Sequence, residues 1–352
     1  MDVYLQHRSI TELPFYNCSS LSKEDLASIN AIRHPLRGIT GFIIGFPMTI
    51  IYILCLRVML QPAIIRKSCY KIMFVVGLYD IGVIILNNFI ICYSLTFGLA
   101  FCDAPNLFYT IGSLHIMSWT GVCYFCLYLA FNRILEALKL RRETIDFFFS
   151  PYRTMIGCLI GFLYSLYGCF FNSPVVYSNV EATPVPNPLD MEFPPGFELR
   201  ETFLIANNYG VVVITTVLYG LFCAIMYKKI KKLGVKDSHN RLQHQLFIQT
   251  TLMCGFNFIC SVTYASVLFL DDFIIVTKIA FFIYQFTSGL QALIYLICNQ
   301  TILNGVKDII YPLLKIERKQ GLDMRTKVEK TNESSQPAVH VISVMESKPR
   351  LT

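Results

Sequence analysis

The sequence predicts an all-α membrane protein, a seven-transmembrane helix bundle with its N-terminus outside and a short amphipathic helix after span seven. Composition is the first reason. Of the 352 residues, 54% are hydrophobic and 15% are charged, whereas a soluble domain carries about 25% charged residues. Apolar windows long enough to cross a bilayer, about 20 residues each, also recur along the chain. Finally, Lys and Arg gather in alternate loops, as the positive-inside rule requires.

Apolar runs bounded by charged residues place the seven spans. They cover residues 38–60, 71–95, 108–138, 153–172, 203–227, 245–270 and 274–298. We therefore expect four regions along the chain. These are an extracellular segment (1–37), the transmembrane bundle (38–298), an amphipathic membrane-surface helix (299–316) and a disordered cytoplasmic tail (317–352).

The orientation follows from the basic residues of the short loops, which resist translocation. With the N-terminus outside, the three inner loops hold eleven of them: Arg66, Lys67, Lys139, Arg141, Arg142, Lys228, Lys229, Lys231, Lys232, Lys236 and Arg241. The outer loops hold only Arg200. This asymmetry accounts for the net charge of +7, so no nucleic-acid partner is expected, and the lipid bilayer is the partner of the basic loops.

The first outer segment contains the sequon "YNCS", which makes Asn17 a candidate for N-glycosylation. Among the thirteen cysteines, few face the oxidising side, and the loop after span four contains none. We predict a disulfide between Cys18 and Cys102, with Cys169 as the competing partner. That loop, 173–202, is rich in proline and acidic residues, which predicts an extended lid without helix or sheet.

Asp80 is the only acid deep inside a predicted span. Intramembrane acids face the bundle interior and usually serve a function, so Asp80 is a candidate switch or ion site. The alternative is a structural hydrogen-bond hub with Asn87, Asn88 or polar groups of span seven. Without a second deep acid, acid–base catalysis by a carboxylate pair is excluded, and we expect no enzyme activity. The "CYFC" motif at 123–126 lies in an apolar helix, and we expect neither a metal nor a cofactor.

Several side chains in the outer halves of spans three and seven are candidates for a ligand pocket. His115 and Trp119 lie one helical turn apart, and Tyr109 precedes them on the same span. Their alternative role is core packing. Lys278, near the outer end of span seven, is the candidate for an anionic ligand, although it could simply extend to the interface beside Asp271 and Asp272. Pockets of this kind combine apolar walls with few polar groups.

Five stretches in order carry a family resemblance: "YNCS", "SCYKIMFVVGLYDI" (68–81), "FCDAP" (101–105), "NRILEA" (132–137) and "ALIYLICNQTI" (292–302). With these stretches the chain resembles nematode serpentine chemoreceptors of class T, seven-transmembrane G-protein-coupled receptors of rhodopsin-like architecture. The resemblance implies switch roles for Asp80, Arg133 and Tyr295. Asn132 stands where such receptors usually carry an acid before the arginine. We therefore expect hydrogen bonds, involving Glu136, to restrain Arg133.

The expected function is that of a chemosensory receptor. The resemblance implies a small-molecule ligand, a heterotrimeric G protein as partner, and a multi-pass location in the plasma membrane, with a sensory cilium as the specific site. The alternative from a different class is a transporter or ligand-gated ion channel. Internal repeats and several polar groups at the membrane midplane would favour a transporter, but the sequence contains no repeat and one deep acid.

Overall fold

A computed structural model of the chain describes residues 10, 16–138, 142–189, 201–233, 238–266 and 273–313. The chain divides into two units, Met1–Lys307 and Asp308–Thr352. The first unit contains the helix bundle. Of the second, the structure describes only the last turns of the final helix.

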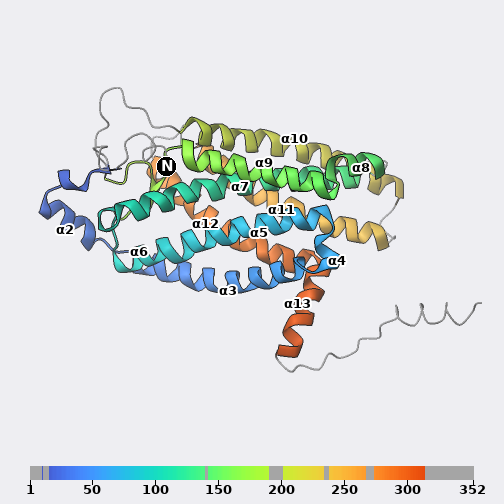
Figure 1. The fold of residues 1–352 in the computed structure, drawn as a ribbon, viewed down its shortest axis with the longest axis horizontal. Coiled ribbons are helices and arrows are strands. Elements are labelled where there is room, and N and C mark those ends of the chain that lie inside the picture. The colour runs from blue at the N-terminus through green and yellow to red at the C-terminus, as the bar shows by residue number, and fades with distance from the viewer. Residues whose placement is uncertain are drawn as a thin grey trace, which may run out of the picture. The chain divides into compact units, whose positions relative to one another are not determined.

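The long helices correspond to the predicted spans (Figure 1). They are α3 (Pro35–Met59), α5 (Ser68–Ile84) with its continuation α6 (Cys92–Phe97), α7 (Pro105–Ala137), α9 (Pro151–Phe171), α10 (Thr202–Leu233), α11 (Ser238–Ser266) and α12 (Phe273–Cys298). A π-helical segment, Ile85–Ile91, joins α5 to α6. The shorter helices are α2 (Lys23–Ala31), α4 (Pro62–Ile65), α8 (Arg142–Phe149) and α13 (Gln300–Leu313).

Six helices in the described part of the chain are long and apolar enough to cross a membrane, and α11 is not among them. Its sequence is less apolar because it begins with "SHNRLQHQ" and buries polar side chains such as Gln249, Asn257 and Ser261. The helix nevertheless packs against α7, α10 and α12. A more polar helix, packed against three others, therefore occupies the place of the predicted sixth span.

Helix α7 is the centre of the bundle. It contacts α5, α9, α10 and α11, and 67% of its apolar window is buried, against 33% for α9 and 18% for α10. Small residues let α9 approach it closely, because a Cβ atom added at Gly161 would lie 2.4 Å from Tyr124 Cδ1 of α7. A Cβ atom added at Gly157 would lie equally close to the Tyr128 hydroxyl. Such small-residue contacts are the usual means of helix association in membranes.

The loop after α9 contains a short antiparallel hairpin, β1 (Val176–Ser178) and β2 (Thr183–Val185), so the prediction that prolines exclude sheet there was wrong. Pro184 pairs with Tyr177 in the middle of the ladder. Hydrogen-bonded and non-hydrogen-bonded pairs alternate in such a ladder, so a proline can occupy one position without losing a bond. The turn is completed by Ala182, whose φ is 53°.

Loops and the N-terminal segment are tied together at one end of the bundle, called here the disulfide end. The disulfide joins Cys18 to Cys102, just before α7. Tyr16 donates a hydrogen bond to the Pro186 carbonyl over 3.2 Å, and the Asn179 side chain donates to the Gly98 carbonyl over 3.1 Å. The cysteine pair is thus the one predicted from sequence, rather than a pair involving Cys169.

Helix α13 lies where the sequence predicts an amphipathic helix. Its first turns bury Ile302, Gly305 and Val306. A Cβ atom added at Gly305 would lie 2.5 Å from a methyl carbon of Val58, so α13 begins against α3. Its position on a membrane surface stays a prediction.

Candidate functional site

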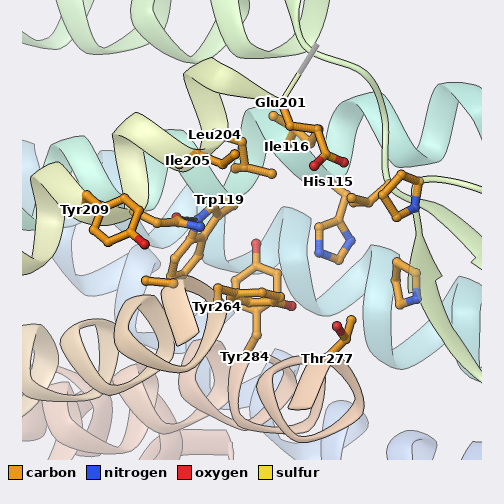
Figure 2. A pocket seen from close by; sticks show the side chains of 15 residues that line it. His115, Ile116, Trp119, Glu201, Leu204, Ile205, Tyr209, Tyr264, Thr277 and Tyr284 are labelled. Carbon is orange, nitrogen blue, oxygen red and sulfur yellow. Dashed lines mark hydrogen bonds between the residues drawn. The ribbon is translucent and has the colours of Figure 1, made fainter. Parts of the chain in front are cut away.

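A cavity of about 140 Å³ opens between α7, α10, α11, α12 and the hairpin loop (Figure 2). Its wall is mainly apolar and aromatic, and the hairpin loop contributes Val175, Pro184 and Pro186. Gly112 of α7 allows this close approach, because a Cβ atom there would lie 2.5 Å from the Val175 carbonyl oxygen. The proline-rich loop therefore forms part of the cavity wall at the disulfide end.

Trp119 is fixed at the cavity by a hydrogen-bond chain that crosses from α7 to α10. Its indole Nε1–H donates to Asn208 Oδ1 over 2.8 Å. The Asn207 side chain donates to the same oxygen over 3.2 Å, and Tyr164 donates to Asn207 Oδ1 over 2.9 Å. Buried amides are costly unless paired, so this chain holds the indole in one orientation.

The floor of the cavity is a cluster of aromatic rings. Trp119 packs edge-on against Tyr284, with ring centroids 5.0 Å apart, and contacts Tyr264 at 5.9 Å. Below them, Cys123 and Cys260 complete a buried cluster between α7 and α11. The hydroxyl of Tyr284 is buried, and no described residue accepts or donates a hydrogen bond to it. A ligand could therefore satisfy this hydroxyl.

A histidine and a glutamate, His115 and Glu201, also line the cavity. Figure 2 shows both on the same side of it, away from Tyr209. His115 is buried on α7 and packs against the Tyr284 ring at 5.1 Å. Glu201 directly precedes α10, and burial raises the pKa of its carboxyl group. The cavity thus combines aromatic walls with a small number of polar groups, the composition expected of a small-molecule site.

Of the four predicted ligand residues, the structure brings His115 and Trp119 into the cavity, whereas Tyr109 and Lys278 do not line it. Tyr109 is buried against Tyr16, with ring centroids 5.5 Å apart, in the core beneath the N-terminal segment. Lys278 forms an ion pair with Glu181 of the hairpin turn, with 3.0 Å between nitrogen and oxygen. Its expected neighbours at 271 and 272 lie outside the described residues.

Asp80 lies at the centre of the bundle and is fully buried. Tyr52 of α3 donates a hydrogen bond of 2.5 Å to its Oδ2 atom, whereas Oδ1 has no partner among the described residues. Tyr295 packs against Tyr52, with ring centroids 6.0 Å apart. The predicted partner Asn87 is buried on the same span, but neither atom of its side-chain amide has a hydrogen-bond partner within the described part of the chain.

Arg133 lies at the other end of α7, buried except for 5% of its surface. Its Nη1 atom pairs with Glu136 Oε2 at 2.9 Å, which is the partner expected from the sequence. Gln249 of α11 donates to the sulfur of Met73, which also lies 3.9 Å from Arg133 Nη2. Asn299 donates to Gln249 over 3.2 Å. Polar contacts thus link α5, α7, α11 and the start of α13.

Asn132 and Asn17 complete the predicted site residues. Asn132 is fully buried, and neither atom of its amide finds a hydrogen-bond partner in the described ranges. Asn17 begins the turn at Cys18, and its Oδ1 accepts a hydrogen bond from the Ser19 amide over 3.1 Å. Glycosylation at Asn17 stays a prediction.

Sequence reasoning did not single out Glu201, Asn208, Tyr264 or Tyr284, although all four line the cavity. Glu201 stood among the acids of a proline-rich loop, and its place directly before α10 was the one signal that could have distinguished it. The tyrosines lie in apolar runs with no pattern that marks one helix face.

Two comparisons with known proteins relate the chain to chemoreceptors. The sequence model of the family described as "Serpentine type 7TM GPCR chemoreceptor Srt" matches residues 3–320. The chain is also 22% identical, over 319 residues, to "Serpentine receptor class T-55" of Caenorhabditis elegans, and the match covers 87% of this chain and 83% of that protein. The family match therefore includes every described helix of the bundle.

Proposed function

The chain belongs to the Srt family of serpentine seven-transmembrane chemoreceptors, and we propose that it binds a small molecule in the cavity and signals through a heterotrimeric G protein. The observation that carries the proposal is the aromatic cavity enclosed by α7, α10, α11 and α12 at the disulfide end. We further propose a plasma-membrane location with this end outside.

The proposed orientation is supported by features at both ends of the bundle. The Cys18–Cys102 disulfide and the sequon at Asn17 lie at the cavity end, and disulfides persist in oxidising compartments. The loops at the other end are rich in Lys and Arg, which favours the cytoplasmic side. Under this orientation the cavity opens toward the outside, and Arg133 lies near the cytoplasm.

The size of the cavity suits a small molecule. An engineered protein cavity of about 150 Å³ accommodates benzene, so the 140 Å³ here fits a ligand with roughly one ring or a short branched chain. Its aromatic wall provides dispersion contacts, and the unpartnered Tyr284 hydroxyl provides one hydrogen-bonding group. Volatile and small water-soluble compounds are of this size.

Helix α11 is the element that could carry the signal, because it takes part in both regions. Tyr264 lines the cavity, Asn257 donates a hydrogen bond to Cys126 of α7, and Gln249 takes part in the polar contacts around Arg133. A ligand that binds one arrangement of α11 better than another shifts the population toward it. We propose that the active arrangement separates α11 from α7 near Arg133 and exposes Arg133 to the G protein.

The proposal is tested by filling the cavity. In cells that express the receptor, G-protein dissociation is measured while volatile and water-soluble compounds are screened. Ala265→Phe places a ring in the cavity, since Ala265 lines it, and should abolish the response to an active compound. Val213→Phe is the matched control, because Val213 is 60% exposed on α10 and faces away from the core.

Two results would contradict the proposal. One is a response that the Ala265→Phe variant retains in full at equal surface expression. The other is ligand-dependent flux or current in vesicles that contain the purified chain without any G protein, which would indicate a transporter or channel instead.

A further inference from the structure

We propose that the cavity binds a small organic cation, an amine protonated at neutral pH, whose ammonium group pairs with Glu201 while its apolar part lies among the aromatic rings. This inference rests on the proposed function, because it names the ligand class of the same cavity. It is carried by the charge of the lining residues, by their aromatic composition and by the size of the space.

Glu201 is the one acidic side chain among the residues that line the cavity, and neither lysine nor arginine is among them. It is half-buried, and no ion pair to it is found in the part of the chain that the structure describes. Lys278, the basic residue that the sequence suggested for the ligand site, is paired with Glu181 instead. A partly desolvated carboxylate without a counter-ion favours a ligand that supplies one.

The burial of Glu201 has a consequence for the empty receptor. Burial raises the pKa of its carboxyl group, so the ionised form is poorly stabilised when the cavity holds no cation. A bound ammonium group would reverse this effect, since an opposite charge within about 4–6 Å favours the ionised form. Glu201 therefore gains more from a cation than an exposed glutamate would.

The walls favour the same ligand class. Trp119, Tyr209, Tyr264 and Tyr284 all line the cavity, and Figure 2 shows their side chains grouped around the space below Glu201. Aromatic faces attract ammonium groups, with tryptophan the strongest of the side chains. An anionic ligand would meet the Glu201 carboxylate with neither lysine nor arginine in the lining to offset the repulsion.

A neutral ligand of the same shape is the relevant competitor. It would fill the aromatic space equally well but would leave the Glu201 carboxylate desolvated and unpaired. A matched amine and alcohol thus differ mainly at the position of the charge. Cyclohexylamine against cyclohexanol, and benzylamine against benzyl alcohol, are suitable pairs for a cavity of about 140 Å³.

Binding can be measured on the purified full-length receptor without a G protein. The chain contains a single tryptophan, Trp119, which lines the cavity, so intrinsic fluorescence reports directly on this site. The unfolding temperature with and without ligand provides a second measurement, because a ligand that binds only the folded state raises it. We expect each amine to bind at least about tenfold more tightly than its alcohol, the ratio expected for one charge-assisted hydrogen bond.

Substitutions at two glutamates locate the effect. Glu201→Gln should weaken amine binding by at least about tenfold and leave alcohol binding within about twofold, since only the charge-assisted bond is lost. Glu201→Asp should retain a preference for the amine because it keeps the carboxylate. Glu181→Gln is the matched control, because Glu181 lies at the same end of the bundle but pairs with Lys278. It should leave both affinities unchanged.

Three results would overturn the inference. The alcohols could bind as tightly as the amines, or Glu201→Gln could weaken the binding of amine and alcohol to the same degree. The third is that neither fluorescence nor the unfolding temperature detects binding of either amine. In each case the receptor function would still be decided by the Ala265→Phe test in cells. The opposite outcome is also distinguishable. If amines bind the purified receptor but no screened compound causes a G-protein response in cells, the ligand class is supported and the proposed function is contradicted.

Discussion

Glu136→Gln should raise the ligand-independent signal of the receptor. Glu136 is the residue that pairs with Arg133, at 2.9 Å, in a position where the sequence has no acid directly before the arginine. Under the proposed mechanism, Arg133 must leave this partner before it can contact a G protein. Removing the charge of Glu136 while keeping the size of its side chain therefore favours the active state.

The magnitude follows from the exposure of the two side chains. A hydrogen bond to a charged group contributes about 1.5–3 kcal/mol when it is buried, whereas an exposed helical ion pair contributes about 0.3–0.5 kcal/mol. The side chain of Arg133 is 6% exposed and that of Glu136 is 38% exposed, so an intermediate value of about 1 kcal/mol is appropriate. That energy changes the ratio of active to resting receptor about fivefold. If about 1% of the receptor is active without ligand, this fraction should rise to about 5%.

The assay measures basal G-protein dissociation, normalised to receptor at the cell surface. Asn132→Asp is the informative comparison, because an acid before Arg133 should lower the basal signal. The structure adds a cost, since Asn132 is fully buried and placing a charge there should also reduce surface expression. A Glu136→Gln receptor with unchanged basal signal, alongside an Arg133→Ala receptor that signals normally with ligand, would refute this reasoning for both residues.

Three further predictions concern stability, measured as unfolding of the purified receptor. Tyr52→Phe removes the hydrogen bond to Asp80 and should cost about 1–3 kcal/mol; an unchanged unfolding temperature would mean that the bond contributes nothing. Cys18→Ser opens a loop that spans 84 residues to Cys102, for which chain entropy sets an upper limit of about 4.6 kcal/mol, and should also speed proteolysis of the N-terminal segment; equal proteolysis rates would argue against that anchoring role. Because burial raises the pKa of Glu201, its contribution to stability is fully present below the ordinary glutamate pKa and is lost as the pH rises through the raised value. The stability of Glu201→Gln relative to wild type should therefore increase over that pH range, and a constant difference would contradict the assignment.

The spans could be predicted from sequence because the length of an apolar run is set by the thickness of the bilayer. The Cys18–Cys102 pair was predictable because few of the cysteines lie in the predicted outer segments. Arg133 was recognised from its place at the end of span three, and its contact with Glu136 follows from helical spacing of three residues. Each of these predictions depends on the type and position of residues along the chain, and none depends on how the helices are rotated.

Rotation of the helices and the paths of the loops could not be predicted in this way. Tyr109 and His115 lie on the same helix, yet one packs under the N-terminal segment and the other faces the cavity. This difference depends on where residues about 90 positions away, such as Tyr16, come to lie. Lys278 likewise has a partner in the hairpin turn, Glu181, that the sequence did not indicate. Such pairings arise from tertiary packing, which periodicity does not encode.

Span two contains a backbone irregularity in a stretch without proline, whereas Pro47 lies inside α3 and neither α11 nor α12 contains a proline. The π-helical segment Ile85–Ile91 is wider than an α-helix, and such segments often occur at functional sites. The carbonyl oxygen of Asn87 within it accepts hydrogen bonds from the Cys92 thiol over 3.2 Å and from Gln285 Nε2 of α12 over 3.4 Å. Gln285 therefore helps to connect spans two and seven.

Replacing this amide tests whether the connection matters. Gln285→Leu leaves the Asn87 carbonyl with one fewer donor and should cost about 1 kcal/mol of stability, with an altered ratio of basal to ligand-induced signal. Thr287→Val is the control on the same helix, because among the described residues the Thr287 hydroxyl bonds only to the Ile283 carbonyl within α12. If both variants behave alike in unfolding and in signalling, the irregular segment has no special coupling to span seven, and the active-state change must be sought in α11 alone.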